Sequence, residues 1–334
     1  MNIYDISEKA GVSIATVSRV LNGSTNVSEK TRKKVLDVMD KYGYTPNAFA
    51  RGLGLNTMKT IGLLCTDSSD LYQAKAIYYI EQQLRTEGYD SILCCSGFEL
   101  EDKMKCLNVL LNKKVDALIL IGSSFVYDTE EENQYIAEAG AQVPVMLLNA
   151  ALDAPNVYGV LTDDYNSVYE AVVKLAKEGR KHILYFYNSH SYSGKKKLAG
   201  YVGAVEALGL TKEEGLLQFY GRYHEDIPGM AEHLRKLRED GIIFDAVVTS
   251  DDELALGVVK YAGQAGIKIP EELSVIGYNN SMLATSSDPE ISSIDIRLER
   301  LCQHLTGSLM RALEGEELPQ KSVFSGELVE RQTT

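Results

Sequence analysis

A short segment near the N-terminus combines small polar residues and one long cation at helical spacing. With Ser13 as N-cap, Val17, Val20 and Leu21 fall on one stripe, the spacing of a helix face that is turned toward a core. The opposite face is small and polar, so it could enter the major groove of DNA without steric clash. Candidate DNA contacts in this segment are Ser13, Ile14, Ala15, Thr16, Ser18, Arg19 and Asn22.

A second helix is expected before this segment. Ile3, Ile6 and Ala10 have the spacing of a short helix, and Gly11 permits the tight turn that follows it. A helix, a turn and a helix with a readable outer face form the helix-turn-helix arrangement. A helical hairpin that only packs would show the same apolar spacing, so the spacing alone leaves both interpretations open.

A third helix is expected after Ser28, which can cap it. Its first turns carry four cations, of which Lys33 is the candidate phosphate contact. A solvated helix face is the alternative interpretation of these charges. The apolar stripe of this helix is expected to consist of Val35, Leu36, Met39 and Tyr42.

Charge is distributed unevenly along the chain. The 334 residues carry a formal net charge of −13, which alone disfavours a nucleic-acid partner. Residues 1–60, however, contain nine Lys and Arg against five Asp and Glu, a net charge of +4, so the remainder carries −17. A basic first part on an acidic body is expected when only that part contacts phosphates.

The run Val12-Ser-Ile-Ala-Thr-Val-Ser-Arg-Val-Leu-Asn22 closely resembles the DNA-binding domain of the lac-repressor (LacI/GalR) family. The run Tyr44-Thr-Pro-Asn-Ala-Phe-Ala-Arg-Gly-Leu53 resembles the hinge of that family, and the resemblance continues to the C-terminus. It implies a helix-turn-helix DNA-binding domain over residues 1–45, a hinge helix or linker over 46–59, and a ligand-binding and dimerisation core over 60–334.

The hinge is expected to be a short and unstable helix, because Gly52 and Gly54 each cost about 1 kcal/mol relative to Ala. A plain linker is the alternative. The resemblance implies that this helix folds when two copies meet over the DNA minor groove, where Leu53 would act as an apolar wedge that bends the duplex. Ala50 and Arg51 are the other candidate DNA contacts of this segment.

From residue 59 onward, apolar runs of strand length alternate with helical patterns, which predicts parallel sheets covered on both faces. With the resemblance, the predicted fold is an all-α helix-turn-helix head plus an α/β periplasmic-binding-protein-like core of two doubly wound parallel-sheet lobes. The first lobe is expected over about 60–161 and 292–320, and the second over about 162–291 and 321–334. Strands are expected at 61–66, 90–95, 117–121, 143–148, 183–187, 246–250 and 274–278.

Polar residues follow most of these strands. Ligands of open parallel sheets bind beyond the carboxyl ends of the strands, so a ligand cleft is expected between the lobes. Helix capping is the alternative for each single residue, and it is the preferred interpretation for Asp163 and Asp252. Because the chain has no Trp, Tyr72, Phe125 and Tyr223 are the candidates for stacking on a sugar. The candidate ligand contacts are Ser68, Tyr72, Ser123, Asn149, Lys197, Tyr223, Asp251 and Asn279.

Three of these candidates depart from the pattern that the resemblance implies. Sugar-binding members usually have Arg where Lys197 stands, Asp where Asn279 stands, and Asn where Asp251 stands. Lys cannot form the bidentate hydrogen bonds of Arg, and Lys197 could instead pair with Asp251. A ligand with several hydroxyl groups is the expected effector, and a nucleobase or an amino acid is the alternative.

An enzyme would need a metal cluster, an activated nucleophile or a phosphate loop. The five histidines show no metal-ligand spacing, and no Walker A, G-x-S-x-G or G-x-G-x-x-G motif is present. Asp251, Asp252 and Glu253 could be proposed as an acid/base cluster, but consecutive residues that open a helix do not converge on one point. No enzymatic activity, cofactor or metal is therefore expected.

The five cysteines are expected to be reduced core residues, with metal binding as the alternative. No signal peptide is recognisable, and no apolar run approaches the roughly 18 residues of a membrane span. The sequence thus predicts a cytoplasmic transcriptional regulator, most simply a repressor, without a membrane partner. It would bind a near-palindromic double-stranded operator as a homodimer under the control of a small molecule.

Overall fold

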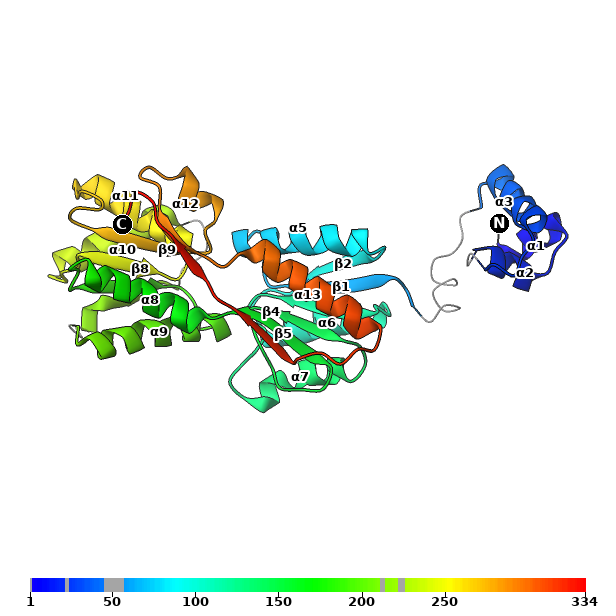
Figure 1. The fold of residues 1–334 in the computed structure, drawn as a ribbon, viewed down its shortest axis with the longest axis horizontal. Helices are drawn as coiled ribbons and strands as arrows, with labels where there is room; N and C mark the ends of the chain where they lie inside the picture. Colours follow the sequence, from blue (N-terminus) through cyan, green and yellow to red (C-terminus); the bar gives the residue numbers. More distant parts are fainter. Residues whose placement is uncertain (1, 22–23, 45–56, 211–213, 222–225) are drawn as a thin grey trace.

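The computed structural model describes residues 2–21, 24–44, 57–210, 214–221 and 226–334. The described chain forms a helical head followed by a core that contains two six-stranded sheets (Figure 1). None of the described helices is long and apolar enough to cross a membrane. The head consists of α1 (Ile3–Ala10), α2 (Ile14–Leu21) and α3 (Glu29–Tyr42).

The three helices of the head enclose a small apolar core. Gly11 ends α1 in the left-handed conformation with φ of 58°, which lets the chain turn directly into α2. Leu36 and Tyr42 of α3 are exposed, so their predicted place in the apolar stripe is wrong. Val38 packs against the core instead, because the 35/38/39 spacing keeps one narrow face of α3 toward α1 and α2. The buried residues are Ile6, Ala10, Val17, Val20, Val35 and Met39.

The first lobe contains the sheet β11-β5-β4-β3-β1-β2, in which all neighbouring strands are parallel. Buried residues of α5 and α13 pack in one core cluster, and those of α6 and α7 pack in another, so helices cover both faces of this sheet. Its strands are β1 (Thr60–Cys65), β2 (Asp90–Cys95), β3 (Ala117–Ile121), β4 (Val145–Leu148), β5 (Val157–Thr162) and β11 (Lys321–Phe324). Its helices are α5 (Leu71–Thr86), α6 (Leu100–Asn112), α7 (Glu130–Gly140) and α13 (Leu298–Leu313).

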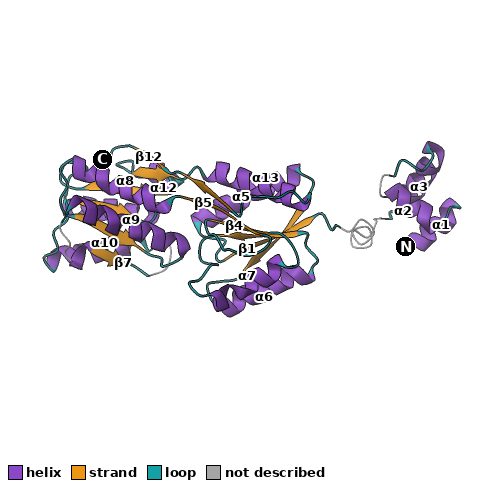
Figure 2. Cartoon of the chain, turned by 60° about the horizontal axis from the view of Figure 1, so that its bottom comes forward, coloured by secondary structure: helices purple, strands orange, loops and turns teal. Residues whose placement is uncertain are grey.

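The second lobe contains the sheet β12-β10-β9-β8-β6-β7, which is parallel except for the antiparallel pair of β10 and β12. Figure 2 shows its helices on both sides of the strands. The strands are β6 (Ile183–Tyr187), β7 (Leu217–Phe219), β8 (Ala246–Thr249), β9 (Ser274–Tyr278), β10 (Ser292–Asp295) and β12 (Glu327–Val329). The helices are α8 (Asp164–Lys177), α9 (Tyr192–Leu208), η1 (Glu214–Leu216), α10 (Ile227–Glu239), α11 (Asp252–Ala265) and α12 (Met282–Ser286).

The chain passes three times between the lobes, and two of these passages differ from the sequence prediction. The first lies between β5 and α8, at residues 162–164. Residues 292–295 were expected in the first lobe, but β10 pairs with β9 of the second sheet. Residues 321–324 were expected in the second lobe, but β11 pairs with β5 of the first sheet. Both strands are short and carry polar residues, so no apolar run in the sequence marks them as sheet members.

Candidate nucleic-acid interface and ligand cleft

Helix α2 presents the predicted reading face to solvent. Val17 and Val20 are buried against α1 and α3, so the other side of this two-turn helix points outward. The Ser13 hydroxyl accepts a hydrogen bond from the Thr16 N–H at 3.2 Å, as an N-cap should. Ser13, Ile14, Ala15 and Arg19 are exposed, whereas Thr16 and Ser18 are half-buried.

Arg19 extends from this face, and no hydrogen bond or ion pair of its guanidinium group occurs among the described residues. A guanidinium group in this position is available to a base edge or a phosphate. Lys33 is exposed on α3. The neighbouring Arg32 instead donates to the carbonyl oxygen of Ser24 at 2.6 Å, so it supports the loop before α3. Asn22, Ala50, Arg51 and Leu53 lie outside the described residues.

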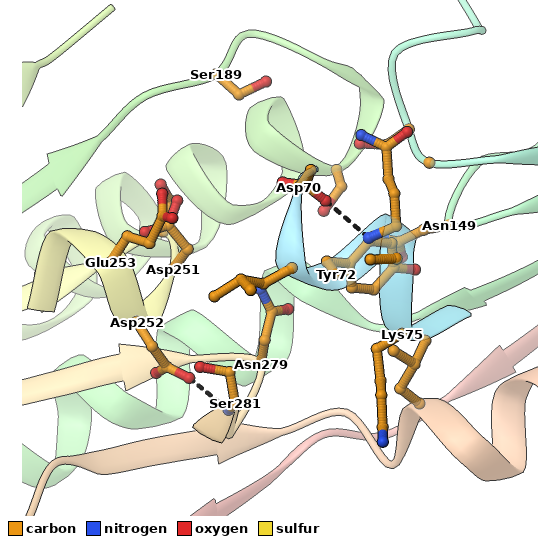
Figure 3. A pocket seen from close by; sticks show the side chains of 18 of the residues that line it. Asp70, Tyr72, Lys75, Asn149, Ser189, Asp251, Asp252, Glu253, Asn279 and Ser281 are labelled. Carbon is orange, nitrogen blue, oxygen red and sulfur yellow. Dashed lines mark hydrogen bonds between the residues drawn. The ribbon is translucent and has the colours of Figure 1, made fainter. Parts of the chain in front are cut away.

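A cavity of about 1310 Å³ lies between the two lobes of the core. It opens where strands of both sheets end, as expected for doubly wound folds. Figure 3 shows Asp70, Tyr72 and Asn149 of the first lobe on one side and Asp251, Asn279 and Ser281 of the second lobe on the other. The lining combines uncharged polar residues that follow strands, such as Ser123, Asn149 and Asn279, with charged residues, among them Asp251 and Lys197.

Six of the predicted ligand contacts line this cavity: Tyr72, Ser123, Asn149, Lys197, Asp251 and Asn279. Ser68 does not, because the exposed turn before α5 carries it away from the cavity, so that prediction is wrong. Phe125 is fully buried in the core of the first lobe and cannot stack on a ligand. Tyr223 lies outside the described residues.

Two buried polar atoms in the wall of the cleft have no hydrogen-bond partner within the described part of the chain. They are the hydroxyl oxygen of Tyr72 and Oδ1 of Asn149. Asn149 is only 8% exposed and has φ of 66°, a conformation that Asn tolerates better than most residues. Buried polar atoms are nearly always paired in folded proteins, so both atoms indicate a position for a polar ligand group or an ordered water.

Lys197 is nine-tenths buried in the floor of the cleft. Its ammonium group donates to the carbonyl oxygen of Ser250 at 2.9 Å and lies 3.6 Å from the centroid of the Tyr278 ring. Burial lowers the pKa of Lys197, and the carboxylate of Asp164, the largest opposing influence, raises it. The anticipated pairing of Lys197 with Asp251 is not formed, because the backbone carbonyl and the aromatic ring hold the ammonium group instead.

Asp251 has two structural partners. One carboxylate oxygen caps α11 by accepting from the Leu254 N–H at 2.9 Å, and the other accepts from the side-chain amide of Asn188 at 2.5 Å. Burial raises the pKa of Asp251, and the hydrogen bond from Leu254 opposes that shift. Because Asp251 also lines the cavity, it is both the cap of α11 and a candidate acceptor for a ligand hydroxyl.

Asp252 is not the helix cap that the sequence suggested. It is 2% exposed and accepts hydrogen bonds from the Ser293 hydroxyl and the Ser281 N–H. Gly277 leaves room for this carboxylate, since a Cβ there would lie 2.3 Å from Asp252 Oδ1. Asp163, by contrast, does cap α8, as predicted. The consecutive residues Asp251 and Asp252 therefore point to different partners.

The loop that carries Asn279 is held in place by hydrogen bonds from its neighbouring residues to other parts of the second lobe. Asn279 and Asn280 have φ of 91° and 48°, so the chain bends sharply after β9. The Asn280 N–H donates to the Ser293 hydroxyl at 3.0 Å, and the Arg331 guanidinium group donates to Asn280 Oδ1 at 2.6 Å. Asp252 and Arg331 thus hold the residues that follow Asn279 in this loop.

The two lobes also contact each other beside the cleft. The Ser123 hydroxyl donates to the Ser191 hydroxyl at 2.9 Å, and the Tyr192 N–H donates to the Ser123 carbonyl oxygen at 3.1 Å. Farther out, Lys195 of α9 forms an ion pair with Asp128, in the loop after β3. The described conformation is therefore one in which this loop bridges the lobes.

Two family models match the chain. One, described as bacterial regulatory proteins of the lacI family, covers residues 2–47, and the other, described as a periplasmic binding protein-like domain, covers residues 172–334. An HTH-type transcriptional regulator of Lachnoclostridium phytofermentans is 53% identical over 334 residues, which are 100% of this chain and 99% of the relative. The chain belongs to the lacI family. It is a transcriptional regulator with a helix-turn-helix DNA-binding region.

Solved structures of other lacI-family regulators share this architecture. The lac repressor dimer bound to operator and an anti-inducer superposes with a TM-score of 0.86 at 22% identity, over 100% of this chain and 98% of that one. A sugar-binding regulator of the family from Escherichia coli, complexed with phosphate, superposes with a TM-score of 0.71 at 26% identity, over 83% of this chain and 99% of that one.

Sequence reasoning missed several residues that line the cleft of this lacI-family regulator. Asp70 caps α5 through the Gln73 N–H at 2.7 Å, and the Gln73 side chain accepts from the Thr66 N–H at 2.9 Å. Ser191 similarly caps α9. All of these positions lie at a strand end or at the start of the next helix. A search for helix caps directly after each predicted strand would have identified Asp70 and Ser191.

Proposed function

We propose that this chain is a repressor that binds a near-palindromic operator as a homodimer and is controlled by a sugar bound between its lobes. The observation that carries the ligand part is the pair of unpartnered buried atoms, the Tyr72 hydroxyl and Asn149 Oδ1, in the wall of the cleft. A ligand hydroxyl can both donate and accept, so it could satisfy either atom.

The remainder of the cleft supports the same ligand class. Ser123, Asn188 and Asn279 add neutral donors and acceptors, and Asp251 adds a charged acceptor. A cavity of about 1310 Å³ has room for more than one sugar ring. The 26% identical Escherichia coli regulator is itself described as sugar-binding, which favours a sugar over a nucleobase or an amino acid.

The dimer is inferred from the size of the reading face. Helix α2 has only two turns and a single long donor, Arg19, so one head can contact few base pairs. Two heads related by a two-fold axis would read two half-sites of a palindromic operator, as is usual for helix-turn-helix dimers. The structural neighbour described as a lac repressor dimer on its operator is consistent with this arrangement.

The DNA part is tested by removing residues 1–45. The truncated protein should lose specific operator binding, while its melting temperature still responds to the same ligands as the full chain. Operator binding by the truncated core would refute the assignment of the head. A reporter gene behind the operator should be more active when the regulator is deleted; lower activity would contradict the repressor role.

The ligand part is tested by a thermal-shift screen of the full chain against monosaccharides, oligosaccharides, nucleobases and amino acids. A saccharide should raise the melting temperature, and Tyr72→Phe should weaken that effect because it removes the unpartnered hydroxyl. Leu71→Ala is a matched control, since this neighbouring side chain lines the mouth of the cleft but offers no hydrogen bond. Stabilisation by a nucleobase or amino acid alone would contradict the sugar.

A further inference from the structure

Four of the five cysteines gather at one edge of the first sheet, in two contacting pairs. Cys65 and Cys95 occupy matched positions on the parallel neighbours β1 and β2, and their Sγ atoms lie 3.4 Å apart. Successive strand residues point to opposite faces, so Cys94 lies on the other face of β2, close to Cys106 of α6, whose thiol donates to the Cys95 carbonyl oxygen at 3.8 Å. Among the described residues, no three potential ligands are arranged to hold a metal ion.

The members of the Cys65–Cys95 pair differ in their access to solvent. Cys95 is exposed on β2, which is the edge strand of its sheet, whereas Cys65 is fully buried. Burial raises the pKa of the Cys65 thiol, and its hydrogen bond with Cys95 adds to the shift. Cys65 is therefore a protected, protonated thiol, and Cys95 is the sulfur that a dissolved oxidant meets first.

The register of the two strands gives a Cα separation that is compatible with a disulfide. A disulfide requires Cα atoms about 4.4–6.8 Å apart and an S–S bond of about 2.05 Å. Neighbouring strands lie about 4.8 Å apart, so the two Cα atoms fall within that range. The sulfurs need to approach by only about 1.4 Å, which rotation of the exposed Cys95 side chain can supply.

We propose that Cys95 and Cys65 are a peroxide-oxidisable dithiol, in which Cys95 reacts first and Cys65 resolves the product to a disulfide. The Cys95 sulfur attacks one oxygen of hydrogen peroxide, the O–O bond breaks, and Cys95 becomes a sulfenic acid while the other oxygen leaves with the Cys95 proton as water. The Cys65 sulfur then attacks the Cys95 sulfur, and the S–O bond breaks. The Cys65 proton leaves with the departing hydroxide as a second water, so two thiols are oxidised by two electrons as one peroxide is reduced.

The disulfide would join two strand ends whose continuations reach the ligand cleft. The Ser96 N–H donates to the Cys65 carbonyl oxygen at 2.9 Å, and the Gly97 N–H donates to the Thr66 carbonyl oxygen at 3.0 Å. Thr66 and Phe98 line the cavity. A covalent bond at Cys65 and Cys95 therefore restrains the segment that precedes this wall, independently of which ligand the cleft binds.

The test uses the full chain, fully reduced and then treated with hydrogen peroxide. Free thiols are alkylated with iodoacetamide, and peptides are identified by mass spectrometry. We expect the loss of two free thiols per chain, a Cys65–Cys95 linked peptide that dithiothreitol removes, and slower hydrogen exchange of the Ser96 and Gly97 amides. Cys95→Ser should abolish all three changes, and its exposed position makes loss of folding a poor explanation.

Cys106→Ser is the matched control, because it removes a thiol of the neighbouring pair and should leave the Cys65–Cys95 peptide in place. Several outcomes would overturn the proposal. They are a Cys95 sulfinic acid beside a free Cys65 thiol, a Cys94–Cys106 link in place of the expected one, a Cys95–Cys95 link between two chains, and thiols that remain unreacted.

Discussion

The carboxylate of Asp252 and the hydroxyl of Ser293 form a 2.6 Å hydrogen bond beneath the loop that carries Asn279. Burial raises the pKa of Asp252 from 3.8 to about 6, although its hydrogen bonds favour the charged form. The folded chain therefore binds a proton at Asp252 more readily than the unfolded chain does. Between pH 4 and 6, the unfolded state releases this proton first, so the contribution of Asp252 to stability decreases as the pH rises.

We predict that this dependence disappears in Asp252→Asn. The difference between the unfolding free energies of the parent chain and the variant should fall by about 1–3 kcal/mol from pH 4 to pH 6. Above pH 7 this difference should be constant. Urea unfolding at a series of pH values measures the difference. Asp153→Asn, at an exposed position, is the control and should show no such slope. An increase with pH would contradict the raised pKa.

Lys197 gives a second prediction, for stability. Replacing it by Met removes the hydrogen bond to Ser250 and the cation–π contact with Tyr278 but also relieves the desolvation cost that lowers the Lys197 pKa, so stability should fall by only about 1–2 kcal/mol. Lys197→Arg should be better tolerated if the guanidinium group reaches the same carbonyl. Chemical denaturation checks both variants. A neutral effect of Lys197→Met would mean that the ammonium group contributes nothing in this position.

The position of Lys197 also shows where sequence reasoning reaches its limit. The residue was predicted to line the cleft, and it does, but its partners are a backbone carbonyl and a ring that only the folded sheet brings together. The same holds for Asp251 and Asp252. Capping rules apply equally to two consecutive acids, and only the position of Ser293 on β10 shows which acid turns inward.

The fold was predictable to the extent that apolar runs marked it. The long apolar strands β1, β3, β6 and β9 were found within a residue or so of their bounds. Strand β10, in contrast, reads Ser-Ser-Ile-Asp, although its first three residues are buried. Its serines are satisfied by hydrogen bonds to Asp252 and Thr334, partners that lie far away in the sequence. Buried polar strands of this kind leave no periodic signal.

DNA readout gives a third prediction. Arg19→Ala should reduce the preference for operator over random DNA by about 1–3 kcal/mol, because a base-edge contact is lost. Lys33→Ala should weaken binding to both DNAs alike and lower the slope of log K against log salt by about 0.9 per head. Fluorescence anisotropy at several salt concentrations separates the two effects. Equal losses on operator and random DNA in Arg19→Ala would reassign Arg19 to the phosphates.

The ligand side chains of the second lobe give a fourth prediction. With a saccharide from the thermal-shift screen, Asp251→Ala should cost more affinity than Asn279→Gly, since charge-assisted hydrogen bonds are the stronger ones. Gly is chosen because Ala would be strained at φ of 91°. Asp251→Asn keeps the cap of α11 and should fall between the two in affinity. Calorimetric titration measures the affinity of each variant for the saccharide. A larger loss of affinity in Asn279→Gly than in Asp251→Ala would mean that Asn279, not Asp251, makes the stronger contact with the ligand.

The last prediction concerns the ion pair between Asp128 and Lys195, which joins the lobes beside the cleft. Asp128→Lys or Lys195→Asp places like charges across the gap, so each should disfavour the bridged arrangement and weaken ligand binding. Both side chains are largely exposed, at 76% and 46%, so the effect should be about 2–5-fold and should shrink in high salt. The double variant restores opposite charges, and its affinity should return toward that of the parent chain. Calorimetric titration of all four proteins in low and high salt measures this coupling. If the double variant binds no better than the single variants, the ion pair does not act on the cleft.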